Sequence, residues 1–439
     1  MVNFSNINDM SVVRHGAGTK KVLLKIFGEK QQNNKTERMP LNISLVIDVS
    51  GSMNDMVGKH NDNNKNPAMG YLNNLSQRVG GFLGGKTKLN QVKEAAHNCI
   101  DLLQDGDYIS IVTFNTHAHT IQESIKIEGN NKQIIKNKIT SMVANGGTNV
   151  HAGWLNGSME VAKKLSSKSI NRVLVLTDGE ISFGYPNSQE IISAVEGLSQ
   201  KGISTTTFGV GDHYNEDLLE KMATVSGGNA YYIEDESKVV SILKEEFSCL
   251  NNVIANNATI EFISEKATAS CLNELDYVNK KFIIGNIVGG KEVTVLLEFK
   301  YDNQSKYGYL FNLGKVNLEF INSEGKKEVK TIDLNYHTVS DEAFALEAIE
   351  EEINIQTTIL EIAKQQKLAK EEMKKGNRNA AYDMLKGTVL SASAYSGDSR
   401  VAGEIGQLNS LMEEGSKYSD LTMSKMLNSM SYITRNSKK

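Results

Sequence analysis

The stretch SLVIDVSGSM, Ser44–Met53, is the most informative part of the sequence, because the other predicted elements are arranged around it. Its apolar run predicts a buried strand over Ser44–Asp48 that ends at a carboxylate. A buried carboxylate must be paired or must coordinate an ion, because its desolvation is costly. The hydroxyls of Ser50 and Ser52 follow at alternate positions, so a single turn offers three oxygen ligands. Hard oxygen ligands suit Mg²⁺, Mn²⁺ or Ca²⁺ rather than zinc or copper.

Two further oxygen donors occur downstream in similar positions. Thr148 lies in the Gly-rich loop GGTN ahead of a helical run, and Asp178 follows the buried-looking strand in RVLVLTDGE. In open α/β sheets, ligands bind in the crevice beyond the carboxyl ends of the strands. We therefore expect these donors to join those of the first turn in one site. The alternative is that the Asp and Ser side chains only cap helices and turns.

These residues also carry a resemblance to a known family. The chain resembles a von Willebrand factor A (VWA) domain over roughly residues 41–250. The resemblance implies a divalent ion held directly by three hydroxyls, with the two aspartates often acting through water. It also implies an open coordination position that an Asp or Glu of a partner protein would occupy. The residues that match the family's metal-ion-dependent adhesion site one for one are Asp48, Ser50, Ser52, Thr148 and Asp178.

The wider pattern of residues 41–250 predicts the fold class. Strands alternate with helices, which is typical of an α/β fold with a doubly wound, mainly parallel, Rossmann-like sheet. With the strand order 3-2-1-4-5-6, the first and fourth strands are neighbours, so Asp48 and Asp178 would meet at one edge. An Asn- and Gly-rich insert at residues 54–87 follows the metal loop, and we regard it as the first candidate for selecting a partner.

The flanking segments predict accessory parts. Residues 251–339 contain short strand patterns between turn residues, typical of an antiparallel β-sandwich. The N-terminal segment, residues 1–40, contains one strand signal, Lys21–Phe27, which we expect to join that sandwich. Residues 340–436 predict a helical bundle that begins with one long helix over Asp341–Lys374. This series also resembles bacterial VWA proteins related to inter-alpha-trypsin inhibitor heavy chains.

Charge and hydropathy argue against two classes of partner. The chain of 439 residues has 48 basic and 52 acidic side chains, so nothing indicates nucleic-acid binding. No apolar run is long enough to cross a membrane. The N-terminal sequence MVNFSNINDM lacks the basic start and apolar core of a secretory signal. We therefore expect neither a nucleic-acid partner nor a membrane span, and a cytoplasmic location.

Two other motifs compete with the metal site. GGFLGGKT, Gly80–Thr87, matches the phosphate-binding P-loop pattern, but a P-loop must follow a buried strand and Tyr71–Val79 reads as polar. Nucleotide binding there remains an alternative. His117 and His119 alternate along a possible edge strand and could suggest zinc. Neither a Cys nor a third His lies near them, so surface histidines are the expected outcome.

The function predicted from these patterns is a non-enzymatic adaptor or scaffold. It would grip an acidic residue of a partner protein through a divalent ion. The alternative is a substrate-recruiting VWA subunit of an AAA+ ATPase complex, which would use the same metal site. A hydrolase is the weakest hypothesis, because no Ser/His/Asp arrangement with a nucleophile elbow occurs.

Overall fold

The computed structural model describes residues 1–30, 38–56, 87–179 and 187–436. The chain folds into two compact units. One unit is Arg38–Asn252, and the other joins Met1–Glu37 with Val253–Lys439. The N-terminal segment therefore shares a unit with the C-terminal part of the chain. Among the described residues, no helix has the length and apolar character that crossing a membrane requires.

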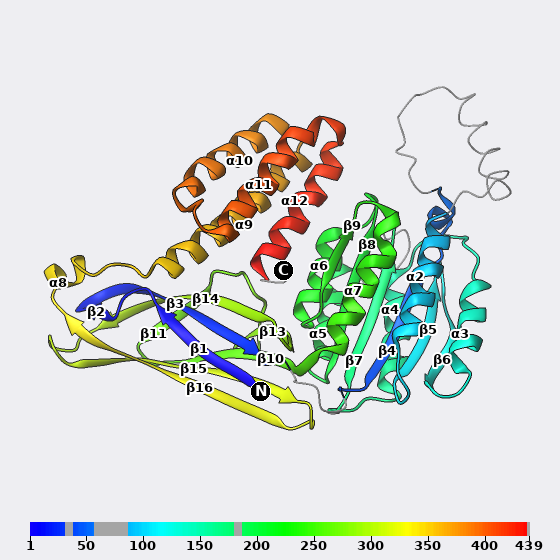
Figure 1. The fold of residues 1–439 in the computed structure, drawn as a ribbon, viewed down its shortest axis with the longest axis horizontal. Helices are drawn as coiled ribbons and strands as arrows, with labels where there is room; N and C mark the ends of the chain where they lie inside the picture. Colours follow the sequence, from blue (N-terminus) through cyan, green and yellow to red (C-terminus); the bar gives the residue numbers. More distant parts are fainter. Residues whose placement is uncertain (31–37, 57–86, 180–186, 437–439) are drawn as a thin grey trace. The chain divides into compact units, whose positions relative to one another are not determined.

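A six-stranded sheet runs through the Arg38–Asn252 unit (Figure 1). The spatial order is β6-β5-β4-β7-β8-β9, which is the predicted order 3-2-1-4-5-6. Strand β6 runs antiparallel to β5, and the other neighbouring pairs are parallel. The strands are β4 (Leu41–Asp48), β5 (Tyr108–Phe114), β6 (Ala118–Lys126), β7 (Ile170–Thr177), β8 (Ile203–Val210) and β9 (Ala230–Ile233).

Helices lie on both sides of this sheet, so the predicted doubly wound α/β class is confirmed (Figure 1). Helices α4, α5 and α6 share an apolar core with the strands, whereas α2 packs with α3 and α7. Several begin at an Asn or Thr whose side chain accepts a backbone N–H bond, which satisfies a free donor of the first turn. The helices are α2 (Lys88–Leu102), α3 (Asn131–Thr140), α4 (Val150–Ala162), α5 (Ser188–Ser199), α6 (Glu216–Val225) and α7 (Val239–Asn251).

The two central strands place the candidate site. Every residue of β4 and β7 is buried, as expected for parallel strands covered on both faces. The two strands pair in parallel up to Ile47 and Leu176. Asp48 is the last residue of β4, and Asp178 directly follows β7. Both carboxylates therefore leave the sheet at the same edge.

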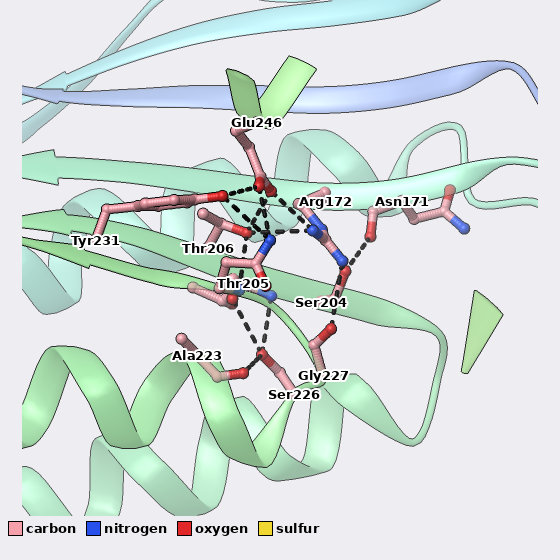
Figure 2. Close-up of polar contacts among 11 residues, drawn as sticks. Asn171, Arg172, Ser204, Thr205, Thr206, Ala223, Ser226, Gly227, Tyr231 and Glu246 are labelled. Atoms are coloured by element: carbon pink, nitrogen blue, oxygen red, sulfur yellow. Dashed lines mark hydrogen bonds and ion pairs between the residues drawn. The ribbon is translucent and has the colours of Figure 1, made fainter. Parts of the chain in front are cut away.

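A buried ion pair holds the other end of β7 to helix α7 (Figure 2). Arg172 Nη1 donates to Glu246 Oε1 at 2.9 Å, and both side chains are almost fully buried. Thr206 also donates to Oε1, while Asn229 and Tyr231 donate to Oε2. Because a buried ion pair needs such additional hydrogen bonds to offset its desolvation, this network fixes β7, β8, β9 and α7 together.

The second unit contains two sheets around one apolar core. A four-stranded sheet has the order β1-β3-β14-β11, and a six-stranded sheet has the order β12-β13-β10-β15-β16-β2. The predicted strand Lys21–Phe27 lies within β3, which pairs with β14 along its length. The strands are β1 (Val2–Asn8), β2 (Val12–Arg14), β3 (Gly16–Gly28), β10 (Val253–Ile263), β11 (Ala267–Cys271), β12 (Tyr277–Val278), β13 (Lys281–Val288), β14 (Glu292–Asn303), β15 (Leu310–Asn322) and β16 (Lys327–Val339).

A helical region follows the sandwich and packs against it within the same unit. Leu23 and Leu296 of the four-stranded sheet form a small core with Ile353 and Leu360 of α9. Asn273 donates a hydrogen bond to the carbonyl of Arg435, at the end of α12, which ties the helices to the sheet. The helices are α8 (Asp341–Ala345), α9 (Glu351–Lys374), α10 (Arg378–Ala392), α11 (Ser399–Glu414) and α12 (Asp420–Arg435).

The structure corrects the sequence reading at two places. The single helix predicted over Asp341–Lys374 is wrong, because α8 ends at Ala345 and α9 begins at Glu351. No Pro or Gly marks the break, and a contact from far away in the sequence accompanies it: Glu350 N donates to the carbonyl of Asp9. In addition, β1 and β2 form in an N-terminal stretch where only one strand was predicted.

Candidate metal centre

Asp48 occupies a buried position between two loops. Its Oδ1 accepts a hydrogen bond from the backbone N–H of Ser50 at 2.7 Å, and its Oδ2 accepts one from the hydroxyl of Thr177 at 2.6 Å. The first bond shapes the turn after β4, and the second joins that turn to the end of β7. Both carboxylate oxygens are thus engaged by the protein, so Asp48 acts on the site mainly by holding its two loops together.

The electrostatic surroundings of Asp48 disfavour a second uncompensated negative charge. Burial is the main cause that raises the pKa of Asp48 to about 6; the nearby Asp178 carboxylate adds to this rise, and the bonds from Thr177 and Ser50 oppose it. Two neighbouring buried carboxylates repel each other, and positive charge beside them relieves this repulsion. This edge of the sheet is therefore suited to a cation.

A chain of hydrogen bonds links the two serines to Asp178. The Oγ atoms of Ser50 and Ser52 lie 3.1 Å apart, and the Ser52 hydroxyl donates to Asp178 Oδ1 at 2.7 Å. Asp178 and Ser50 are buried, whereas Ser52 is partly exposed. Three residues of the predicted set, Ser50, Ser52 and Asp178, are therefore linked by direct contacts, and Ser52 supplies a partly exposed hydroxyl.

Thr148 approaches the same place from the loop before α4. It is buried, and a Cβ atom added to Gly179 would lie 2.8 Å from Thr148 Oγ1. The hydroxyl thus packs directly against the residue that follows Asp178. Gly179 leaves the room that this close approach needs.

Backbone hydrogen bonds join the loops that carry the candidate site. Gly51 N donates to the carbonyl of Gly146, and Asn145 N donates to the carbonyl of Val49. These bonds join the loop after β4 to the loop that carries Thr148. Asn149 N donates to the carbonyl of Asn115, which adds the loop after β5. The site is therefore built on a fixed backbone frame.

The spacing of the oxygens fits a small divalent cation. Ligands that bind Mg²⁺ in adjacent octahedral positions at 2.0–2.1 Å lie about 2.9 Å apart. The hydrogen-bonded separations of 3.1 Å between the serine hydroxyls and 2.7 Å from Ser52 to Asp178 lie close to that value, so these oxygens need little movement to become adjacent ligands. The residues present thus fit the divalent cation that the resemblance implies. Among the described residues, no cluster of three or more His, Cys, Asp or Glu side chains offers a second centre of the carboxylate, imidazole or thiolate type.

The P-loop pattern and the insert fall largely outside the described residues. That is so for Gly80–Lys86 of the P-loop pattern, and for residues 57–86 of the insert predicted at 54–87. Both ends of the insert are described, and an isolated bridge pairs Met56 with Thr87 beside the candidate centre. Thr87 itself caps α2 by accepting a bond from Asn90 N. His117 and His119 are exposed, and His119 lies on β6.

Two residues of the centre escaped the sequence analysis. Thr177 donates to Asp48, and its position directly before Asp178 was the only available signal. Lys88 Nζ donates to Asp178 Oδ2 at 2.9 Å, and its side chain is only 11% exposed. Nothing in the local sequence separates Lys88 from an ordinary surface lysine, because its contact depends on how the chain returns from the insert.

Comparison with known proteins identifies the unit that carries the centre. The model of the von Willebrand factor type A domain family matches residues 42–245. Residues 42–245 form a VWA domain. Proteins with VWA domains commonly interact with other proteins in a metal-dependent way, which agrees with the position of the oxygen cluster at the edge of the sheet.

The relatives of the chain include bacterial and animal proteins. Protein sll0103 of Synechocystis is 28% identical over 243 residues, which cover 55% of this chain and 49% of that protein. YfbK of Escherichia coli is 27% identical over 285 residues, with 62% and 44% covered. Inter-alpha-trypsin inhibitor heavy chain H3 of Homo sapiens is 24% identical over 230 residues, with 51% and 22% covered. The chain spans about half the length of these curated relatives or less.

Two solved structures resemble the whole chain and not only its VWA domain. A von Willebrand factor type A protein from Catenulispora acidiphila has a TM-score of 0.72 at 15% identity, with 98% of this chain and 96% of that chain covered. The ArnB paralog VWA2 from Sulfolobus acidocaldarius has a TM-score of 0.62 at 16% identity, with 98% and 99% covered. At these identities the likeness concerns the fold, and it includes the sandwich and the helices as well as the VWA domain.

Proposed function

We propose that this chain binds a partner protein through a divalent cation at the VWA domain and acts as an adaptor or scaffold. One observation carries the proposal: Ser50, Ser52 and Asp178 form a continuous chain of oxygen contacts, although they come from two separate loops. Thr148, from a third loop, packs against Gly179 beside them. Side chains that only cap turns would have no reason to meet in this way.

The chemistry of the donors favours a cation that remains reactive toward an acid group. The hydroxyls of Ser50, Ser52 and Thr148 would be neutral ligands, and Asp178 is the carboxylate in contact with Ser52. Asp48 would hold the ligand loops through its bonds to Ser50 and Thr177. A divalent ion bound here would supply positive charge and an open position for a partner's Asp or Glu, and Mg²⁺, Mn²⁺ and Ca²⁺ all suit such donors.

We propose a binding role rather than a catalytic one for the two carboxylates. A general base needs an oxygen that can reach a substrate proton. Both oxygens of Asp48 accept bonds from Ser50 and Thr177, and both oxygens of Asp178 accept bonds from Ser52 and Lys88.

Partner capture with matched serine variants tests the proposal. The immobilised full chain is incubated with lysate of the native cells in Mg²⁺, then washed with chelator, and the eluted proteins are compared. Ser52→Ala removes a central hydroxyl, whereas Ser141→Ala removes an exposed hydroxyl that bonds only within its own turn at Lys138. We expect a protein that elutes with chelator and binds the Ser141→Ala chain but not the Ser52→Ala chain. Capture that survives both chelator and Ser52→Ala would contradict the proposal.

A further inference from the structure

A lysine ammonium group lies inside the candidate metal centre. Lys88 Nζ donates to Asp178 Oδ2 at 2.9 Å, while Asp178 Oδ1 accepts the hydroxyl of Ser52. The side chain of Asp178 is fully buried and that of Lys88 is 11% exposed. One carboxylate oxygen therefore faces the hydroxyl ligands, and the other faces a cation that belongs to the chain itself.

Lys88 lies at the start of α2, where a positive charge is unusual. Lys88 is the first residue of the helix, where the helix dipole disfavours a positive charge. Its backbone N–H donates to the carbonyl of Asp55, and its neighbour Thr87 is the N-cap, so the start of the helix is fixed beside the metal loop. The helix itself gains nothing from a positive charge here, whereas the ion pair with Asp178 does.

We propose that Lys88 is an intramolecular cation that competes with the divalent ion for Asp178 and so sets the ion affinity of the site. This inference rests on the proposed function, because it assumes that an ion binds among these oxygens. Two cations beside one buried carboxylate repel each other strongly, so binding of one disfavours the other. Lysine suits the role, because its flexible four-carbon stem lets the ammonium group withdraw toward solvent while the backbone stays in place.

Lys88 would also compensate the charge of Asp178 when no ion is bound. Removal of the ion from a site without Lys88 would leave the buried Asp178 uncompensated close to Asp48, and an unpaired buried charge is strongly destabilising. With Lys88 in place, Asp178 keeps a partner in either state. The chain then releases its ion readily, and partner binding responds to the concentration of free divalent ion.

A different role for Lys88 makes the opposite prediction. If the ammonium group stayed in place beside the ion and helped to orient Asp178, its removal would weaken ion binding or leave it unchanged. The affinity of a variant without the charge therefore separates competition from support. Lys93 provides the matched control, since it lies on the same helix and its Nζ donates to the carbonyl of Thr140 instead.

The test is Mn²⁺ binding to the full chain, measured by calorimetry and by the electron paramagnetic resonance signal of free Mn²⁺. We expect Lys88→Met to bind Mn²⁺ about tenfold more tightly than the unchanged chain, and Lys93→Met to bind it equally well. Lys88→Gln, which keeps a hydrogen-bond donor for Asp178, should also bind more tightly and secures the test if the Met variant does not fold. Equal or weaker binding by the folded Lys88 variants, with Mn²⁺ bound by the unchanged chain, overturns the competition. If neither the unchanged chain nor the Lys88 variants bind Mn²⁺, the proposed function fails as well.

Thermal unfolding supplies a second readout. The single tryptophan, Trp154, is buried in the VWA domain, so its fluorescence follows the unfolding of this unit. Lys88→Met should melt at a lower temperature than the unchanged chain without Mn²⁺, and Mn²⁺ should raise its melting temperature by a larger amount. Equal shifts for both proteins contradict the competition.

Discussion

The ammonium nitrogen of Lys88 lies 2.9 Å from Oδ2 of Asp178, on the carboxylate whose other oxygen accepts the Ser52 hydroxyl. The fold thus already directs one positive charge into the crevice at the carboxyl ends of β4 and β7. A site that pairs a buried carboxylate with a cation of its own and with neutral hydroxyls is prepared for cationic charge. This relationship leads to predictions about the site and about the frame that holds it.

The close packing of Gly179 against Thr148 predicts a selective loss of metal binding. In Gly179→Ala the new methyl group would lie 2.8 Å from Thr148 Oγ1 and displace that hydroxyl. We expect weaker Mn²⁺ binding and a stability loss of about 1–3 kcal/mol from overpacking. Gly197→Ala, on α5, meets no atom within 4 Å and should leave Mn²⁺ binding unchanged. Calorimetry on the two variants checks this, and normal Mn²⁺ binding by Gly179→Ala would place Thr148 outside the centre.

The bonds of Asp48 predict that its charge matters more than its shape. Asp48→Asn keeps the size of the side chain but loses the charge and one acceptor oxygen toward Ser50 and Thr177. We expect Mn²⁺ affinity to fall about 10–100-fold, as for other groups that orient metal ligands. Asp101→Asn, at an exposed carboxylate paired with Lys136, is the control and should bind Mn²⁺ normally. Similar affinities for the two variants would show that Asp48 has no part in ion binding.

The strands and loops that carry the candidate site could be predicted from the sequence, because each is a local pattern. The apolar runs that end at Asp48 and Asp178 mark central parallel strands, and their order follows from alternation with helices. Thr148 was found by its Gly-rich loop ahead of a helix. Lys88 was not, because a lysine in the first turn of a helix looks the same whether it faces solvent or a buried carboxylate.

The rest of the fold depended on contacts between distant residues. Strand β1 mixes polar and apolar residues, and its partner β3 pairs in turn with β14, far along the chain. The break between α8 and α9 has no helix-breaking residue, and the bond from Glu350 N to the carbonyl of Asp9 joins positions 341 residues apart. Hydrophobic periodicity reports only on residues close together in the sequence, so it could not predict these long-range contacts.

The buried pair of Arg172 and Glu246 predicts a strongly non-additive stability effect. Arg172→Met leaves Glu246 buried without its cation, so we expect a loss of about 3–5 kcal/mol. The double variant Arg172→Met/Glu246→Gln removes the uncompensated charge and should lose less than the single variant. Urea unfolding followed by Trp154 fluorescence measures both. Lys136→Met, which breaks a more exposed pair with Asp101, should cost about 1 kcal/mol or less. A double variant that loses as much stability as Arg172→Met, or more, would contradict the role given to the network.

The same network predicts how the stability of the VWA domain depends on pH. Burial acts to raise the pKa of Glu246, but Arg172 and the bonds from Asn229, Tyr231 and Thr206 outweigh it and hold the pKa below the ordinary value of 4.5. A lowered pKa stabilises the folded domain above the unfolded pKa, and this stabilisation is lost as the pH falls through the folded pKa.

The matching measurement compares the unchanged chain with Glu246→Gln. The difference in unfolding free energy should be largest near neutral pH and should shrink as the pH falls below 4.5. Other carboxylates titrate equally in both proteins, so the difference isolates Glu246. A difference that stays constant, or that grows toward acid pH, would contradict the lowered pKa.

The most direct test of the central claim is anomalous diffraction from crystals of the full chain grown with Mn²⁺. We predict a single strong manganese peak bounded by the Oγ atoms of Ser50 and Ser52, by Thr148 Oγ1 and by the side chain of Asp178, with the Lys88 ammonium group moved away from Asp178 Oδ2. Diffraction that shows these oxygens without a manganese peak, or with the only peak elsewhere on the chain, would contradict it.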